Sequence, residues 1–191
     1  MGNGAIFLDR DGIINYDYGY VHKISEFKFI PNVLETLQLL NELNMPMFIV
    51  TNQAGIARGF YDENDLFILH NYLLSIFEEK NIKIKEIFFC PHHENGKLPK
   101  YSYNCDCRKP KPGMILKAKE KYKLNLEQSF LIGDKYSDIQ AGFNAGIKTN
   151  IITNLKNEEK GNSYKIDFRY HKVNTLYNAY ELIKKIITND K

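Results

Sequence analysis

The chain has 191 residues, of which 43% are apolar and 26% charged, and its formal net charge is +3. This mix excludes a disordered or fibrous protein, and the length suits one domain over residues 1–191. No apolar run nears the roughly 20 residues that span a bilayer, no export signal is visible, and the mild, scattered positive charge disfavours nucleic acid as a partner, so we expect a cytoplasmic monomer.

Short apolar runs alternate along the chain with segments of helical spacing. In chain order the prediction is strand 5–8, helix 33–43, strand 47–50, helix 65–80, strand 87–89, helix 113–122, strand 130–132, helix 137–145, strand 150–152 and helix 175–188. The strands are continuously apolar, which is typical of a parallel sheet covered on both faces. The sequence therefore predicts an α/β fold with a doubly wound, mostly parallel sheet.

Two long segments, 11–31 and 91–112, interrupt this alternation. Loops of such length inside a compact domain are usually functional or disordered. We interpret both as functional loops, and neither is long enough to house a large cap domain.

Carboxylates directly follow two of the predicted strands. Asp9 and Asp11 come after strand 5–8, and Asp134 comes after strand 130–132. Open α/β sheets bind their ligands at the carboxyl ends of the strands. Each motif alone could be a turn or a helix cap, but acidic groups packed together repel one another unless a cation lies between them. The three residues therefore predict a site for Mg²⁺, which prefers oxygen ligands.

A hydroxyl and a glycine-containing turn follow strand 47–50. Thr51 and the backbone N–H groups of the turn reach the same edge of the predicted sheet. These groups suit a phosphate, although Thr51 alone could be a simple helix cap.

All three cysteines, Cys90, Cys105 and Cys107, lie around the second long loop. An odd count is a poor framework for disulfides, and such clustering in a reducing compartment indicates a metal site. With an imidazole from His92 or His93, the thiolates complete the donor set of a structural Zn²⁺ site. The alternative is a group of free thiols.

The inserted zinc-binding loop, at about residues 90–109, also carries two cations. Arg108 and Lys109 directly follow the last cysteine, so ordering the loop would fix both of them. Arg108 offers a bidentate fork for a second phosphate or a sugar, and Lys109 offers a point charge.

Four motifs, in order, resemble those of the haloacid-dehalogenase-like phosphatases, namely Asp9-x-Asp11-Gly12, Thr51, Lys109, and Gly133-Asp134 with Asp138. The resemblance covers roughly residues 3–153. It implies that Asp9 is the nucleophile, and that Asp11 protonates the leaving oxygen and then activates water. It also implies that Thr51 and Lys109 offset charge on the transferring oxygens, with Asp138 in support.

Within this class, the zinc loop and segments 9–15, 19–22, 51–59 and 107–114 resemble the D-glycero-D-manno-heptose 1,7-bisphosphate phosphatases. The resemblance implies removal of the 7-phosphate from a phosphorylated sugar, with Mg²⁺ and structural Zn²⁺ as cofactors and His92 as the fourth zinc ligand. It also implies a set of sugar contacts, namely Asp17, Tyr18, Gly19, Tyr20, Asn52, Gln53, Ala54, Arg108 and Lys135.

Three other functions stay open. A histidinol phosphatase shares the zinc loop, although its version resembles a tighter one than the span from His92 to Cys105. Ala54 and Glu94 depart from the heptose pattern, which keeps another small sugar phosphate possible as the substrate. A zinc-containing nucleic-acid-binding module is the remote alternative, because it has no use for the three carboxylates together.

Overall fold

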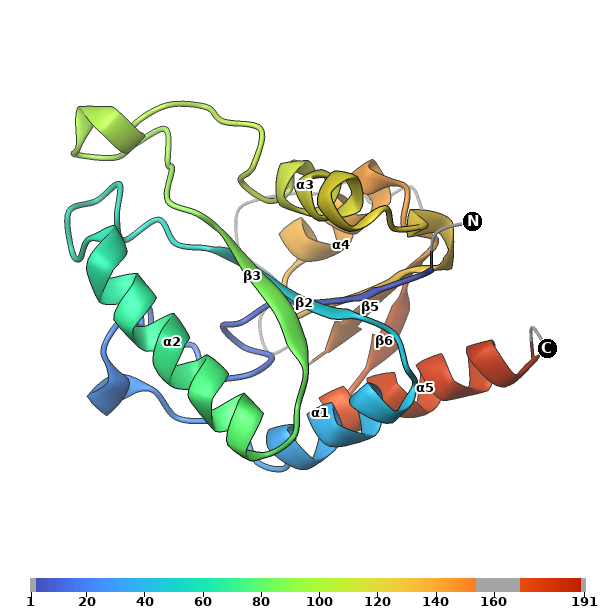
Figure 1. Ribbon diagram of the computed structural model, residues 1–191. Helices are drawn as coiled ribbons and strands as arrows, with labels where there is room; N and C mark the ends of the chain where they lie inside the picture. Colours follow the sequence, from blue (N-terminus) through green and yellow to red (C-terminus); the bar gives the residue numbers. More distant parts are fainter. Residues whose placement is uncertain (1–2, 154–168, 190–191) are drawn as a thin grey trace.

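The computed structural model describes residues 3–153 and 169–189. At its centre lies a sheet of six strands in the order β3-β2-β1-β4-β5-β6, with every neighbouring pair parallel (Figure 1). The strands are β1 (Ile6–Leu8), β2 (Met47–Asn52), β3 (Ile84–Cys90), β4 (Phe130–Gly133), β5 (Thr149–Thr153) and β6 (His171–Val173). The predicted parallel sheet is confirmed.

Helices cover both faces of this sheet, as expected for a doubly wound fold (Figure 1). They are α1 (Val33–Glu42), α2 (Glu63–Glu79), α3 (Gly113–Tyr122), α4 (Tyr136–Ala145) and α5 (Leu176–Asn189). In β1, Ile6 and Leu8 belong to the core shared with α1, α2 and α5, whereas Phe7 belongs to the core shared with α3 and α4. Because successive strand residues point to opposite faces, burial on both sides explains the uninterrupted apolar runs.

Each predicted strand and helix is present, with small shifts at the ends. Strand β6 was not predicted, because it has only three residues and none of them is buried. The two long segments contain short 3₁₀ turns, η1 (Ile24–Glu26) and η2 (Pro99–Tyr101), and a third, η3 (Leu126–Gln128), precedes β4.

The register of the central strands places the expected catalytic residues together. Leu8, the last residue of β1, pairs with Ile49 in β2 and with Ile132 in β4. The residues that follow these three positions therefore lie toward the same, carboxyl edge of the sheet. The backbone N–H of Asp9 donates to the carbonyl of Ile132 at 2.9 Å, which ties the start of the first loop to β4.

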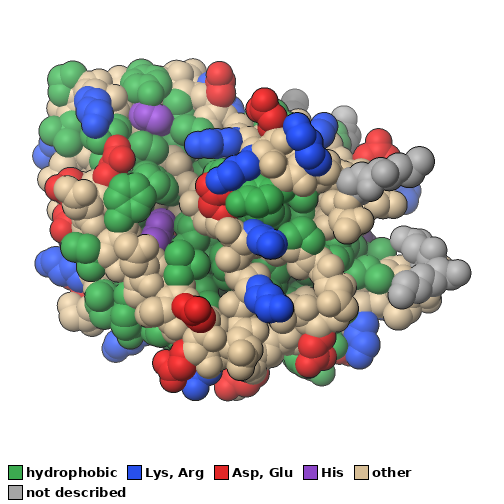
Figure 2. All heavy atoms as spheres, in the orientation of Figure 1, with side chains coloured by type: hydrophobic (Ala, Val, Ile, Leu, Met, Phe, Trp, Pro, Cys, Tyr) green, Lys and Arg blue, Asp and Glu red, His purple; other side chains and the backbone are tan. Residues whose placement is uncertain are grey.

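The surface shown in Figure 2 mixes charges of both signs. Basic and acidic side chains are interspersed on this face, with apolar side chains between them. Within residues 3–153 and 169–189, no helix has both the length and the apolar character needed to cross a bilayer.

Candidate active site

Asp9 lies at the end of β1, 5% exposed, and forms a buried ion pair. The ammonium Nζ of Lys109 lies 2.8 Å from Asp9 Oδ1 and 2.6 Å from Asp138 Oδ1, and it also donates to the carbonyl of Val50 at 2.8 Å. Burial would lower the pKa of Lys109, but the charges of Asp138 and Asp9 outweigh it and raise that pKa. Lys109 therefore stays charged between the two carboxylates.

The acidic groups outnumber this single buried ammonium. Burial raises the pKa of Asp9 to about 6, and the charge of Lys109 only partly opposes it. Burial, followed by the charges of Asp9 and Asp138, raises the pKa of Asp134 to about 8. Carboxylate oxygens of Asp9, Asp134 and Asp138 all lie within 4.8 Å of one another. A cation among them would relieve this repulsion.

Asp134 shows where such a cation would fit. Its Oδ1 atom is buried and has no hydrogen-bond partner among the described residues. Gly12 packs against the same carboxylate with a φ of 93°, and a Cβ atom at that position would lie only 2.1 Å from Asp134 Oδ2. Hard oxygen donors with a spare lone pair suit Mg²⁺, so the residues present fit the expected ion.

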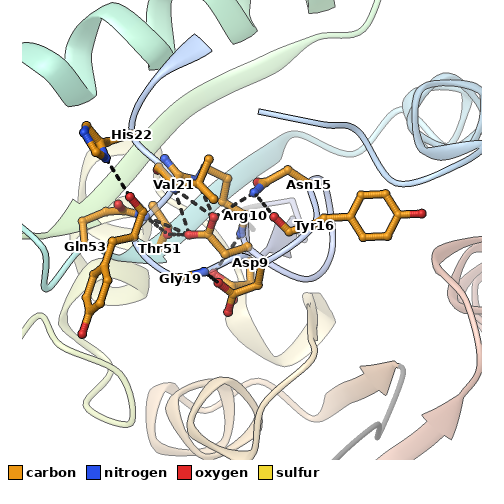
Figure 3. A network of polar contacts seen from close by, with 12 residues as sticks. Asp9, Arg10, Asn15, Tyr16, Gly19, Val21, His22, Thr51 and Gln53 are labelled. Carbon is orange, nitrogen blue, oxygen red and sulfur yellow. Dashed lines mark hydrogen bonds and ion pairs between the residues drawn. The ribbon is translucent and has the colours of Figure 1, made fainter. Parts of the chain in front are cut away.

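The carboxylate of Asp11 lies elsewhere than the sequence led us to expect. Its two oxygens accept from Nη2 of the fully buried Arg10 at 2.9 and 3.0 Å, and it also accepts from the side-chain amides of Asn15 and Gln53. Figure 3 shows these three donors, Arg10, Asn15 and Gln53, converging from different segments. The described carboxylate cluster contains Asp138 in its place. The physical reason is the buried guanidinium, which requires a counter-charge, and Asp11 is the adjacent acid.

Two polar residues predicted to contact substrate are already engaged by the protein. Gln53 accepts from the hydroxyl of Tyr61 at 2.5 Å and donates to Thr51 Oγ1 at 2.8 Å, and it is 2% exposed. The amide of Asn52 exchanges two hydrogen bonds with the backbone of Lys109, at 3.0 and 3.1 Å. Asn52 thus joins β2 to the segment that presents the catalytic lysine.

An open cleft of about 570 Å³ lies over these groups. It is lined by most of the predicted residues, namely Asp9, Asp11, Asp17, Gly19, Tyr20, Thr51, Asn52, Gln53, Ala54, Arg108, Lys109, Lys135 and Asp138. Tyr18 does not line it. That ring is 61% exposed and stacks on Tyr16 at 5.9 Å.

Lys135 and Asp17 both line the cleft and form an ion pair of 2.8 Å. Burial would raise the pKa of Asp17, but the hydrogen bond and charge of Lys135 lower it. Burial opposes the charge of Lys135, whereas Asp134, Asp9 and Asp17 together raise its pKa. Both groups are therefore charged at neutral pH.

Three residues that the sequence patterns do not indicate, Arg58, Tyr61 and Ser137, also line the cleft. Arg58 lies near the end of the turn that begins at Thr51, where the hydroxyl, the amide and the N–H groups suit a phosphate but nothing singles out the arginine. Nothing in the local pattern distinguishes the buried Tyr61 from an ordinary core aromatic residue.

The cysteines and one histidine form a compact cluster beside the cleft. The Sγ atom of Cys105 lies 3.5 Å from that of Cys90 and 3.3 Å from that of Cys107, and Nδ1 of His92 lies 3.3 Å from Cys107 Sγ. Ligands 2.3 Å from a tetrahedral Zn²⁺ would be about 3.8 Å apart, so the cluster is close to the required geometry. These separations are too long for a disulfide, which agrees with three free cysteines.

The structure brings His92 to this cluster and leaves His93 outside it. His92 Nε2 lies 2.6 Å from the hydroxyl of Tyr103, a contact that fixes the ring orientation. His93 instead accepts a backbone hydrogen bond from Asn95 at 3.1 Å and lies toward Arg58.

Comparison with known proteins identifies the family. A HAD-hydrolase-like family model matches residues 106–175. D-glycero-alpha-D-manno-heptose-1,7-bisphosphate 7-phosphatase of Campylobacter jejuni is 46% identical over 159 residues, covering 83% of this chain and 87% of the relative. The corresponding beta-anomer enzyme of Haemophilus influenzae is 45% identical over 150 residues, covering 78% and 81%. The chain belongs to the heptose-1,7-bisphosphate 7-phosphatase family.

A solved structure of this phosphatase family supports the same conclusion. The D,D-heptose 1,7-bisphosphate phosphatase from B. bronchiseptica, complexed with magnesium and phosphate, superposes with a TM-score of 0.82 at 26% identity over 96% of this chain and 99% of that one. The chain is thus a phosphoric monoester hydrolase of the haloacid-dehalogenase-like superfamily. Its Cys/His cluster is compatible with zinc, and a magnesium complex is known for its relative.

Proposed function

We propose that this phosphatase removes the 7-phosphate of D-glycero-D-manno-heptose 1,7-bisphosphate and releases heptose 1-phosphate, a step toward nucleotide-activated heptose. The observation that carries the proposal is the pairing of Asp9 with Lys109 beside Asp134, in a cleft that Arg108 and Lys135 also line. The acidic cluster of Asp9, Asp134 and Asp138 suits a metal-bound phosphate. The further cations that line the cleft suit the rest of an anionic sugar.

In the proposed reaction Asp9 attacks the phosphorus atom, and the bond between phosphorus and the sugar oxygen breaks. Asp11 gives a proton to that oxygen, so the sugar leaves as an alcohol. Asp11 then takes a proton from water as the water attacks the aspartyl-phosphate, which returns Asp9 and releases inorganic phosphate. One residue serves as acid and then as base, so no proton is gained or lost by the enzyme over the cycle.

Hydrogen bonds fix the position of Asp11 in the cleft. Arg10 and Gln53, both labelled in Figure 3, donate to its carboxylate, and Asp11 lines the cleft. Thr51 Oγ1 lies 3.5 Å from Asp11 Oδ2, which leaves the hydroxyl able to turn toward a phosphoryl oxygen. Lys109 is already fixed beside Asp9 and offsets negative charge there without reorganising.

Asp9 and Asp134 would hold Mg²⁺. Asp11 remains a predicted ligand, although its carboxylate would have to leave Arg10 to reach the ion, and Asp138 is the nearer acid in the described cluster. When bound, Mg²⁺ supplies positive charge that polarises the phosphoryl group and keeps the carboxylates ionised.

Cys90, His92, Cys105 and Cys107 would hold a structural Zn²⁺ that orders the zinc loop. The loop is polar and has few apolar side chains to bury, so the metal would supply its folding free energy. Arg108 donates to the carbonyl of His92 at 3.3 Å, which links the position of this cation directly to the metal cluster.

A phosphate-release panel tests the proposed function. It compares both anomers of heptose 1,7-bisphosphate with fructose 1,6-bisphosphate and histidinol phosphate, at equal concentrations and with Mg²⁺. We expect kcat/KM for one heptose anomer to exceed the values for fructose 1,6-bisphosphate and histidinol phosphate. A higher kcat/KM for histidinol phosphate would reject the assignment. Asp9→Asn should abolish turnover with zinc content unchanged. Activity of this variant at the wild-type level would contradict the covalent mechanism.

A further inference from the structure

We infer that Arg58 is a further residue of the subsite for the phosphate that is not hydrolysed, beside Arg108, which the family resemblance already implies as a substrate contact. The inference rests on the proposed function, in which the substrate carries phosphates at its two ends. Arg58 lies in the turn after β2, where its backbone N–H donates to the carbonyl of Ala54 at 3.1 Å. Both arginines line the cleft that contains Asp9.

The four cations of the cleft differ in how they are paired. Lys109 is bound by Asp9 and Asp138, and Lys135 is bound by Asp17. In contrast, Arg58 and Arg108 form no ion pair with any carboxylate in residues 3–153 and 169–189. The lysines are therefore neutralised within the protein, while the arginines retain charge for a ligand.

Arg58 is held in place without using all its donors. Its guanidinium carbon lies 5.7 Å from the ring centroid of Tyr20, and one terminal nitrogen lies 3.5 Å from Nε2 of His93. Its Nε atom is buried with no hydrogen-bond partner among the described residues. A buried N–H group without a partner is costly, and a phosphate oxygen would satisfy it. Arg58 thus connects the loops after β1, β2 and β3.

Both guanidinium groups lie beside the same two residues of the zinc loop. A terminal nitrogen of Arg58 lies 3.5 Å from Nε2 of His93, and Arg108 donates to the carbonyl of His92 at 3.3 Å. The two like charges beside this segment repel each other. A phosphate dianion between them would remove that repulsion, because guanidinium groups bind phosphate in a planar, two-point manner.

The groups around Asp9 and Lys109 cannot bind the second phosphate as well as the reacting one. There the buried Lys109 is shared between two carboxylates, and further negative charge requires the Mg²⁺ that the reacting phosphate uses. A substrate with its reacting phosphate at Asp9 would place its other phosphate away from this acidic cluster. The unpaired arginines provide the positive charge that remains in the cleft.

The test compares heptose 1,7-bisphosphate with heptose 7-phosphate, which lacks only the distal phosphate. For Arg58→Met we expect kcat/KM on the bisphosphate to fall about 10- to 100-fold, mainly through KM, as for loss of a hydrogen bond to a charged group. On the 7-phosphate the change should stay below about 3-fold. Arg58→Lys should recover part of the activity on the bisphosphate. Lys97→Met is the matched control, because Lys97 is an exposed cation on the zinc loop that does not line the cleft.

Equal losses on both substrates, or no loss on the bisphosphate, would overturn the subsite. A wild-type enzyme that hydrolyses p-nitrophenyl phosphate but not the bisphosphate would instead reject the proposed function, and the subsite with it. Thermal melting of each variant with Mg²⁺ present separates misfolding from lost binding, since a variant that has lost only a phosphate contact should melt near the wild-type temperature. A folded Arg58→Lys variant with no recovery over Arg58→Met would count against the subsite.

Discussion

His70 provides a pH-dependent contribution to stability that can be calculated from its surroundings. It lies in α2, is 4% exposed, and its Nε2 atom is 3.2 Å from Nη1 of Arg10. Arginine can only donate, so this ring nitrogen must accept, and the imidazole is neutral. Burial, followed by the charge of Arg10, lowers the pKa of His70 from 6.5 to about 3.

The sign of the effect follows from this depressed pKa. Above pH 6.5 the imidazole is neutral in both the folded and the unfolded chain, so the full stability is present. Below pH 6.5 the unfolded chain takes up a proton that the folded chain cannot accept until about pH 3. Each unit in this window costs about 1.4 kcal/mol, so the free energy of unfolding should fall by about 2 kcal/mol between pH 8 and pH 5 through His70 alone.

The assay is urea unfolding of the metal-loaded protein at pH 5, 6, 7 and 8, for the wild type and for His70→Gln. The glutamine can still accept from Arg10 but does not titrate in this range. The stability gap between the two proteins should therefore shrink by about 2 kcal/mol from pH 8 to pH 5. His171→Gln, at an exposed position in β6, is the control. A gap that does not change with pH would refute the reasoning, because His70 would then have an ordinary pKa in the folded protein.

Three further predictions test the acidic cluster of Asp9, Asp134 and Asp138 and the zinc cluster. Lys109→Met should lower the free energy of unfolding by about 3 to 5 kcal/mol, since it leaves two buried carboxylates without their partner, and an unchanged urea midpoint would contradict the ion-pair assignment. Cys105→Ser should reduce bound zinc from about one per chain to well below that in elemental analysis and weaken substrate binding, whereas full zinc content would reject the cluster. Gly12→Ala should abolish measurable Mg²⁺ binding by calorimetry, because the new Cβ would lie 2.1 Å from Asp134. Gly19→Ala also has a positive φ but meets no atom within 4 Å, so it should retain Mg²⁺ binding; equal behaviour of the two would exclude the steric explanation.

Much of the fold and the main chemical groups could be predicted from local sequence patterns. Uninterrupted apolar runs identify strands that are buried on both faces, and this periodicity does not depend on distant contacts. The position of Asp9 and Asp134 directly after such runs places them at one edge of a parallel sheet. The spacing of the cysteines and histidines around one loop is also a local feature of the sequence, and it predicted the cluster. Strand β6 was not predicted, because a strand of three residues with none buried contains no uninterrupted apolar run.

Only tertiary contacts decided the orientation of the side chains that follow the strand ends. Asp11 turns to a buried arginine, and Asp138 joins the acidic cluster through Lys109, which lies 100 positions from Asp9 in the chain. Arg58 borders the cleft because loops from three different strands meet around it, although its own turn gives no sign of this. The sequence by itself determined which groups reach the edge of the sheet, because that depends on local periodicity. Only the folded chain decided which charges neutralise one another, since each buried charge takes the nearest opposite charge in space.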